Sequence, residues 1–441
     1  MLRVQNTYAE RKVQMRVEKV LRMKRREQLA RRTAIAIIPP RVHIATEVHS
    51  WNHFCSDYAI NSGITFFNLL PGFYTNSSST CCQEALHAVS LASLALKLRQ
   101  SGLMAQARRH YGKAIIALNV TLNDPVLTAD DSVLVTLLLF SLFETIVPDY
   151  LDTTLPDTEF QCHIHFRGAL MLLRWRAEQG RRCELDRRVF AFFSHICLMS
   201  MFVDHGLHDA KWSSLEKFTA PWIKDPLLEP ILGRSVHFKR RAQAQITARG
   251  DQAYRLEVLP QLIRDGISVS EGLEATAISV RSSSDPNLPS GQQPTAFNHM
   301  FEVSNKTTEA IVRSLYRAVR YHVVELVLDL IARMKEEVDT TSHEFNGQVY
   351  VSERLVMILE QICGDICAVL NFDSKHHIEE DKVGMAHRAF GMFFPMVVPL
   401  FSSLAGEEKR GWLREKLRLI GESTGFGLAT LAAQMINPID S

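Results

Sequence analysis

One stretch near the C-terminal end of the sequence has the spacing of a catalytic serine motif. Gly421-Glu422-Ser423-Thr424-Gly425 fits the pattern G-x-S-x-G, and it follows an apolar run and precedes a predicted helix. In α/β-hydrolases this motif makes a strand-to-helix turn that exposes the serine nucleophile, and the acid and the histidine follow it in the chain. No histidine follows Ser423, and the strands of that fold are not indicated elsewhere. We therefore expect a glycine-rich turn between two helices, and a serine hydrolase using Ser423 is the least favoured alternative.

Two pairs of side chains have a spacing that could contribute to a metal site. His205 and His208 are three residues apart, and Cys363 and Cys367 are one helical turn apart. A zinc site needs at least three protein ligands, and neither pair has a further ligand at a suitable spacing. We expect these side chains to be core or solvated residues. An enzyme that uses His205 and His208 remains a minor alternative, and we predict no metal ion or other cofactor in this chain.

The cysteines do not form a disulfide framework. They are sparse and scattered, and most lie in apolar surroundings, where a reduced thiol behaves as a small hydrophobic side chain. This usage is typical of a reducing compartment. The eight positions are Cys55, Cys81, Cys82, Cys162, Cys183, Cys197, Cys363 and Cys367.

A basic segment near the N-terminus could contact phosphate groups or act as a nuclear import signal. Residues 1–32 contain eleven Lys or Arg and three Glu, an excess of eight positive charges in a chain of net charge +2. Such an arm suggests a polyanion or an import receptor as its partner. The alternative is a solvated charged helix. The candidate residues are Lys24, Arg25, Arg26, Arg31 and Arg32.

Three consecutive helices are predicted between residues 103 and 175. The first ends at Asn123-Asp124-Pro125, because proline lacks an amide donor and disfavours helix in the residue before it. The second, 132–147, is apolar nearly all round, so it should be central and buried. We predict Thr128 as its N-cap with Asp131 as the capping-box partner. The third helix begins near residue 163, and small residues at 168 and 169 should let a neighbouring helix approach closely.

The remainder of the chain also shows helical periodicity, and no stretch alternates in period two for long enough to require a sheet. The predicted fold class is all-α, a multi-helix array of packed antiparallel helices. We divide the chain into a basic helical arm at 1–38, a first helical part at 39–280, a polar linker or disordered loop at 281–296 and a second helical part at 297–441. Further helices are expected at 8–32, 82–100, 186–204, 234–248, 252–280, 305–337, 351–370, 380–403, 408–420 and 426–436.

The sequence gives no indication of a membrane segment or a secretory signal. The N-terminus is charged from Arg3 onward and has no apolar core of a signal peptide. The apolar stretch 389–406 is barely of spanning length, and Pro395 and Pro399 interrupt it. We predict a buried, proline-broken core helix there.

The order of these segments resembles the regulatory region of fungal binuclear zinc-cluster (Zn2Cys6) transcription factors. The resemblance implies a non-catalytic all-helical domain that acts in the nucleus, attached to a head in which cysteines hold two zinc ions. No cysteine precedes Cys55, so we expect a headless or truncated member, with a zinc cluster only if an upstream segment is missing. The similar segments are 10–32, 51–54, 87–96, 107–125, 130–144 and 165–180.

The resemblance also defines the expected partners. Without the zinc-cluster head, DNA binding should be weak or indirect, because a basic helix supplies phosphate affinity and no base readout. The partners implied are the transcription machinery or co-regulators, and a second copy of the chain in a homodimer. The alternative is a helical interaction or scaffold protein with no role at promoters.

Overall fold

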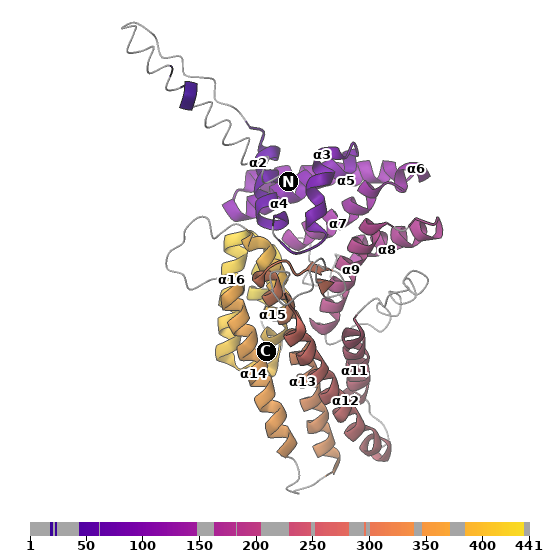
Figure 1. Cartoon of the computed structure of the whole chain (residues 1–441), viewed down its shortest axis with the longest axis vertical. Helices are drawn as coiled ribbons and strands as arrows, with labels where there is room; N and C mark the ends of the chain where they lie inside the picture. The colour runs from indigo at the N-terminus through magenta and orange to yellow at the C-terminus, as the bar shows by residue number, and fades with distance from the viewer. Residues whose placement is uncertain are drawn as a thin grey trace.

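The computed structural model confirms the all-α fold class (Figure 1). Among the described residues, the only sheet is a pair of two-residue strands. The predicted basic site residues 24–32 lie outside the described part of the chain, as do His205, His208 and most of the predicted linker. The structure describes residues 18–20, 23, 44–60, 62–147, 163–181, 183–203, 229–247, 252–281, 295–296, 300–338, 346–370 and 384–435.

The first group of helices packs around α4 and α7. Helix α4 lies along α5 and also contacts α2 and α7, and α8 and α9 pack on α7. The three predicted helices of residues 103–175 are therefore confirmed as α5, α7 and α8. The elements are α2 Thr46–Phe54, the π-helical turn η1 Cys55–Ala59, the 3-10 turn η2 Phe67–Leu69, α3 Leu70–Asn76, α4 Thr80–Leu98, α5 Ser101–Thr121, α6 Pro125–Thr128, α7 Asp131–Ile146, α8 His163–Glu178 and α9 Glu184–Val203.

Helix α7 is buried on every side, as its composition predicts. All residues from Ser132 to Phe143 are buried. A Cβ atom built on Gly168 of α8 would lie 3.7 Å from Cδ2 of Leu137, so α8 approaches α7 at ordinary van der Waals distance.

The predicted N-cap of α7 is wrong. The cap is Asp130, whose side chain accepts a hydrogen bond from the amide of Ser132. Pro125 opens a separate one-turn helix, α6, which is capped by Asp124. Thr128 falls inside that turn, and its hydroxyl donates to the carbonyl oxygen of Asp124 at 2.9 Å.

The second group packs around α13, which crosses the lower half of the molecule in Figure 1. Helices α11, α12, α14 and α15 all contact α13. Helix α13 is buried around its whole circumference over most of its length. The elements are α11 Pro230–Thr247, α12 Gln252–Ser279, β1 Thr295–Ala296, β2 Phe301–Glu302, α13 Lys306–Val338, α14 Asn346–Leu370, α15 Met385–Leu400, the 3-10 turn η5 Ser403–Ala405, α16 Glu407–Thr424 and α17 Gly427–Gln434.

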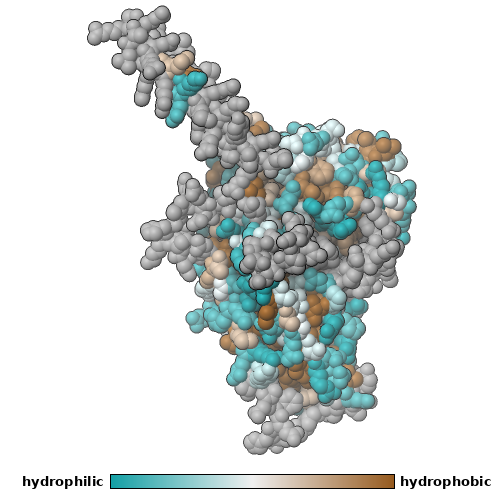
Figure 2. Space-filling model, in the orientation of Figure 1, coloured by the Kyte–Doolittle hydropathy of each residue, from teal (hydrophilic) through white to brown (hydrophobic). Residues whose placement is uncertain are grey.

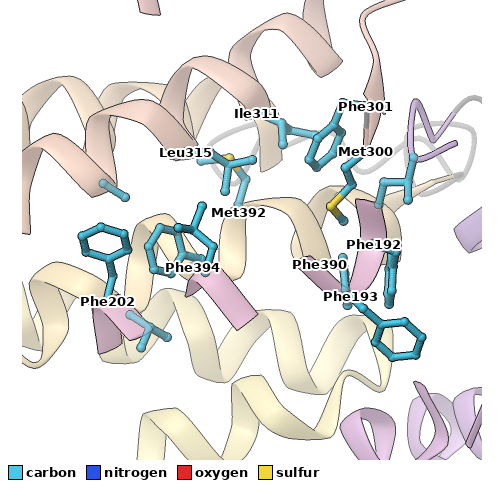
Figure 3. Packing of buried hydrophobic residues seen from close by; sticks show 14 of the residues in the cluster. Phe192, Phe193, Phe202, Met300, Phe301, Ile311, Leu315, Phe390, Met392 and Phe394 are labelled. Carbon is cyan, nitrogen blue, oxygen red and sulfur yellow. The ribbon is translucent and has the colours of Figure 1, made fainter. Parts of the chain in front are cut away.

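An aromatic cluster joins the two groups. The ring of Phe390 on α15 stacks on Phe192 of α9 at 5.9 Å and lies edge-on to Phe67 of η2 at 5.9 Å. Phe426, between α16 and α17, contacts the same ring at 5.9 Å. Figure 3 shows side chains of α9, α13, α15 and the β2 region converging in this core. The two groups therefore share one continuous hydrophobic core.

Backbone pairing and the last helices add to this junction. The amide of Glu302 donates to the carbonyl oxygen of Gly63 at 2.7 Å, and the amide of Thr65 donates to that of Met300 at 3.0 Å. Helix α16 packs on α4, and α17 packs on α7. Elements after residue 295 therefore complete the packing of the first group.

Helix α15 runs through both of its prolines. Pro395 and Pro399 are inside the helix and buried, and the helix ends at Leu400. The prediction of a buried core helix is confirmed, although the prolines do not break it. Within the described residues, no helix is both long and apolar enough to cross a membrane.

Candidate functional site

Ser423 does not lie on a nucleophile elbow. It occupies the last turn of the continuous helix α16, and its hydroxyl donates to the carbonyl oxygen of Ile420 at 3.3 Å. Of the glycine-rich segment, only Gly425 has a turn conformation, with φ +71°, because the helix continues through Thr424. A nucleophile elbow needs a strand before the serine, and a helix occupies that position here.

Of the cysteine pair on α14, Cys363 has the surroundings of a core thiol, and Cys367 is partly exposed. Cys363 is buried, and burial raises the pKa of its thiol to about 11, which disfavours the thiolate that a metal requires. In the described part of the chain, no group of three or more His, Cys, Asp or Glu side chains could hold a metal ion.

A buried charged site in the first group is centred on Arg176 of α8, which is 1% exposed. Its guanidinium forms an ion pair with Asp131 at the start of α7, and its Nε lies 2.9 Å from Oδ1 of Asp186 on α9. It also donates to the carbonyl oxygen of Ala129 at 3.0 Å. Burial disfavours the charged guanidinium, but the hydrogen bond to Asp131 and the charge of Asp186 outweigh this, so the pKa of Arg176 is raised. One side chain thus ties three helices together.

A second polar cluster connects α5, α7 and α8. The hydroxyl of Tyr111 donates to Oε1 of Glu144 at 3.1 Å, and Nε2 of His165 lies 3.0 Å from the same oxygen. The ring of Tyr111 stacks on Phe143 with 4.4 Å between centroids. This cluster is a structural hydrogen-bond network inside an aromatic core, since Tyr111, Glu144 and His165 contact one another across the helix interfaces.

Buried polar groups also hold α13 in the second group. Arg320 is 4% exposed, forms an ion pair with Glu274 of α12, and its Nε donates to the hydroxyl of Ser270 at 3.2 Å. On another side of the same helix, Ser402 donates to Glu325, and the Ser402 hydroxyl lies 3.2 Å from that of Tyr321. Because α13 is surrounded by other helices, these pairs specify which of its sides faces which neighbour.

Two buried histidines should make the protein sensitive to acid. Burial, with a contribution from Arg388, lowers the pKa of His387 to about 4, against a weaker upward effect of a hydrogen bond to the Asp57 backbone. Burial lowers the pKa of His195 to about 3. In the unfolded chain both histidines bind a proton near pH 6.5. Below that pH the unfolded state therefore binds more protons than the folded state, and stability falls as the pH falls.

We expect the free energy of unfolding to decrease between pH 6.5 and pH 4 by about 1.4 kcal/mol per pH unit for each such histidine. Above pH 7 these two histidines do not make the free energy of unfolding depend on pH. In the His387→Gln variant, the free energy of unfolding should depend less on pH, because one proton fewer is bound on unfolding. The measurement is urea unfolding between pH 5 and pH 8. His49→Gln, at an exposed position of α2, is the matched control. An unchanged slope in His387→Gln would contradict the expectation.

A family match identifies the class of the first group of helices. The family described as the fungal specific transcription factor domain matches residues 69–204, which run from η2 and α3 through α9. The matched family is a domain of transcription factors and not an enzyme family. The resemblance found in the sequence is confirmed over this segment. Comparisons with curated proteins and with solved structures found no match.

Proposed function

We propose that the protein is a nuclear transcriptional regulator that acts through its helical body and carries a basic arm. The observation that supports this most directly is the match of residues 69–204 to a transcription factor domain. The contacts of α15, α16 and α17 with that domain support a single regulatory body, because helices from both groups share one core. Partners would be co-regulators or the transcription machinery, and contact with DNA through the arm would be weak and independent of base sequence.

The basic arm has a specific expected role in this proposal. With Lys24, Arg25 and Arg26 replaced by alanine, the full chain carrying a fluorescent tag should lose most of its nuclear accumulation. The physical reason is that a short run of adjacent cations is what an import receptor or a polyanion recognises. The measurement is the ratio of nuclear to cytoplasmic fluorescence in living fungal cells.

The control variant removes the same charge elsewhere. Lys409, Arg414 and Lys416 on α16 are replaced by alanine together. The first two form ion pairs with Glu360 and Glu407, and the third lies 5.5 Å from the centroid of the Trp412 ring, and each of these interactions is individually weak. This control should stay nuclear. Fusion of the full chain to a heterologous DNA-binding domain should then change transcription of a reporter several-fold. A chain that is cytoplasmic in all forms and silent at the reporter would instead support the scaffold alternative.

A further inference from the structure

Exposed apolar side chains gather at the end of α5 and on α6. Val126 is 80% exposed, Ile116 is 68% exposed and Val120 is 67% exposed, and Leu122 and Leu127 are also exposed. Figure 2 shows apolar side chains together at the upper right of the molecule, where Figure 1 places α6. Single exposed apolar residues are ordinary on a protein surface, but a contiguous group marks an interaction site.

The fold does not explain this group. The face of α5 that packs against the core consists of Ala107, Tyr111, Ala114 and Leu118, all of which are buried. These residues follow a 4-3-4 spacing, so they form one stripe along the helix. Ile116 projects from the opposite side, where it contributes nothing to that packing. A reason for its apolar character must therefore lie outside the chain's own core.

A second stripe with the same spacing runs along the outer side of α5. It contains Arg109, Lys113, Ile116 and Val120, so two cations are followed by two apolar side chains. The cations are weakly engaged, because Lys113 lies 4.0 Å from Glu84 with its own side chain 63% exposed. Helix α5 contains no Asp or Glu between Ser101 and Thr121. The stripe is therefore cationic in its first half and apolar in its second half.

We propose that this outer stripe of α5, with Val126 and Leu127 of α6, is a docking surface for an acidic amphipathic helix of a partner protein. Such a helix would place apolar side chains at i, i+3 or i+4 and i+7 on the apolar half, and carboxylates beside Arg109 and Lys113. The inference deepens the proposed function and rests on it, since it names the surface that would bind a co-regulator.

A second copy of this chain fits the surface less well. Because α5 has no carboxylate, two α5 helices facing each other could not neutralise Arg109 and Lys113. The nearest acid in the chain order, Asp124, already accepts a hydrogen bond from the amide of Val126 at 2.8 Å as the cap of α6. Charge complementarity therefore favours a partner that brings its own acids.

The test is selection of peptides from a random 16-residue display library on the full-length protein. Enriched peptides should be acidic and have apolar residues at helical spacing, and they should bind in solution by fluorescence anisotropy. In the Ile116→Ser/Val126→Ser variant the dissociation constant of the selected peptide should rise by about tenfold or more, because two anchors are lost. Arg109→Glu should weaken binding by about threefold or more, and less so at high salt.

The controls replace exposed side chains on other helices. Val356→Ser on α14, at a position 58% exposed, and Arg264→Glu on α12 should leave binding unchanged. The proposal is overturned if no peptides are enriched over the starting library, or if the enriched peptides lack acidic residues. It is also overturned if the Ile116→Ser/Val126→Ser variant binds the selected peptide as tightly as the unchanged protein. It is also overturned if sedimentation shows a dimer that this variant dissociates, since the occupant is then a second copy. All of these readouts are independent of nuclear import and of reporter transcription, so the docking surface and the proposed function can fail separately.

Discussion

Replacing Arg176 by alanine is expected to lower the free energy of unfolding by about 3–5 kcal/mol, the loss typical of a broken buried ion pair. The side chain is almost fully buried, and Asp186, its partner on α9, is buried as well. Alanine would leave the carboxylate of Asp186 in the interior without its cation, and would leave the carbonyl oxygen of Ala129 without this donor. The cost is therefore mainly that of uncompensated buried groups.

The surroundings of Arg176 make lysine a poor substitute. The guanidinium reaches Asp131, Asp186 and the Ala129 carbonyl from different nitrogen atoms, and a single ammonium group cannot reproduce that geometry. Arg176→Lys should therefore recover only a small part of the loss.

The measurement is urea unfolding followed by circular dichroism. The control is Arg174→Ala on the same helix, where Arg174 pairs with Glu178 and both side chains are more than half exposed. An exposed pair of this kind contributes about 0–1 kcal/mol, so the control should shift the midpoint only slightly. Equal midpoints for the Arg174 and Arg176 variants would show that the three-helix contact does not stabilise the domain.

The position of Arg176 could have been recognised from the sequence, but its partners could not. In the segment of α8, a buried stripe with the spacing i, i+3, i+4 and i+7 consists of Ala169, Leu172, Leu173 and Arg176, and an arginine on such a stripe indicates a buried ion pair. The two aspartates come from other helices, so their approach depends on how those helices pack. Arg176 was accordingly missed as a candidate, while the predicted cationic residues 24–32 remain a prediction outside the described chain.

The hydrophobic periodicity was sufficient to predict which segments form helices. It was insufficient to predict where the helices begin and which of their faces are buried. Helix α7 was predictable because its apolar residues leave no polar face to place in water. For its start, Thr128, Asp130 and Asp131 are all acceptable caps, and the choice depends on the extra turn that begins at Pro125. For α13, the periodicity did not indicate that Arg320 is buried, where Glu274 of α12 neutralises it inside the protein.

Gly425→Ala should be the second most damaging substitution, with an expected loss of about 3 kcal/mol or more in the free energy of unfolding. Gly425 ends α16 with φ +71°, a conformation that costs an L-residue about 1–2 kcal/mol. In addition, a Cβ atom there would lie 2.7 Å from the carbonyl oxygen of Ser93 and 2.8 Å from the amide nitrogen of Lys97. Both are backbone atoms of α4, so α16 and α17 would have to move away from that helix.

Gly180→Ala separates the two contributions. Gly180 follows α8 with φ +75° and is bridged by the bond from the amide of Arg181 to the carbonyl oxygen of Arg176, and a Cβ atom built on Gly180 meets nothing within 4 Å. Urea unfolding of both variants should therefore give a smaller loss at Gly180, and the difference measures the contact between the end of α16 and α4. Equal losses would mean that this contact contributes nothing. Because α4 lies within the matched domain and α16 lies beyond its last residue, a selective loss at Gly425 would mean that the transcription factor domain depends on helices outside its own boundaries.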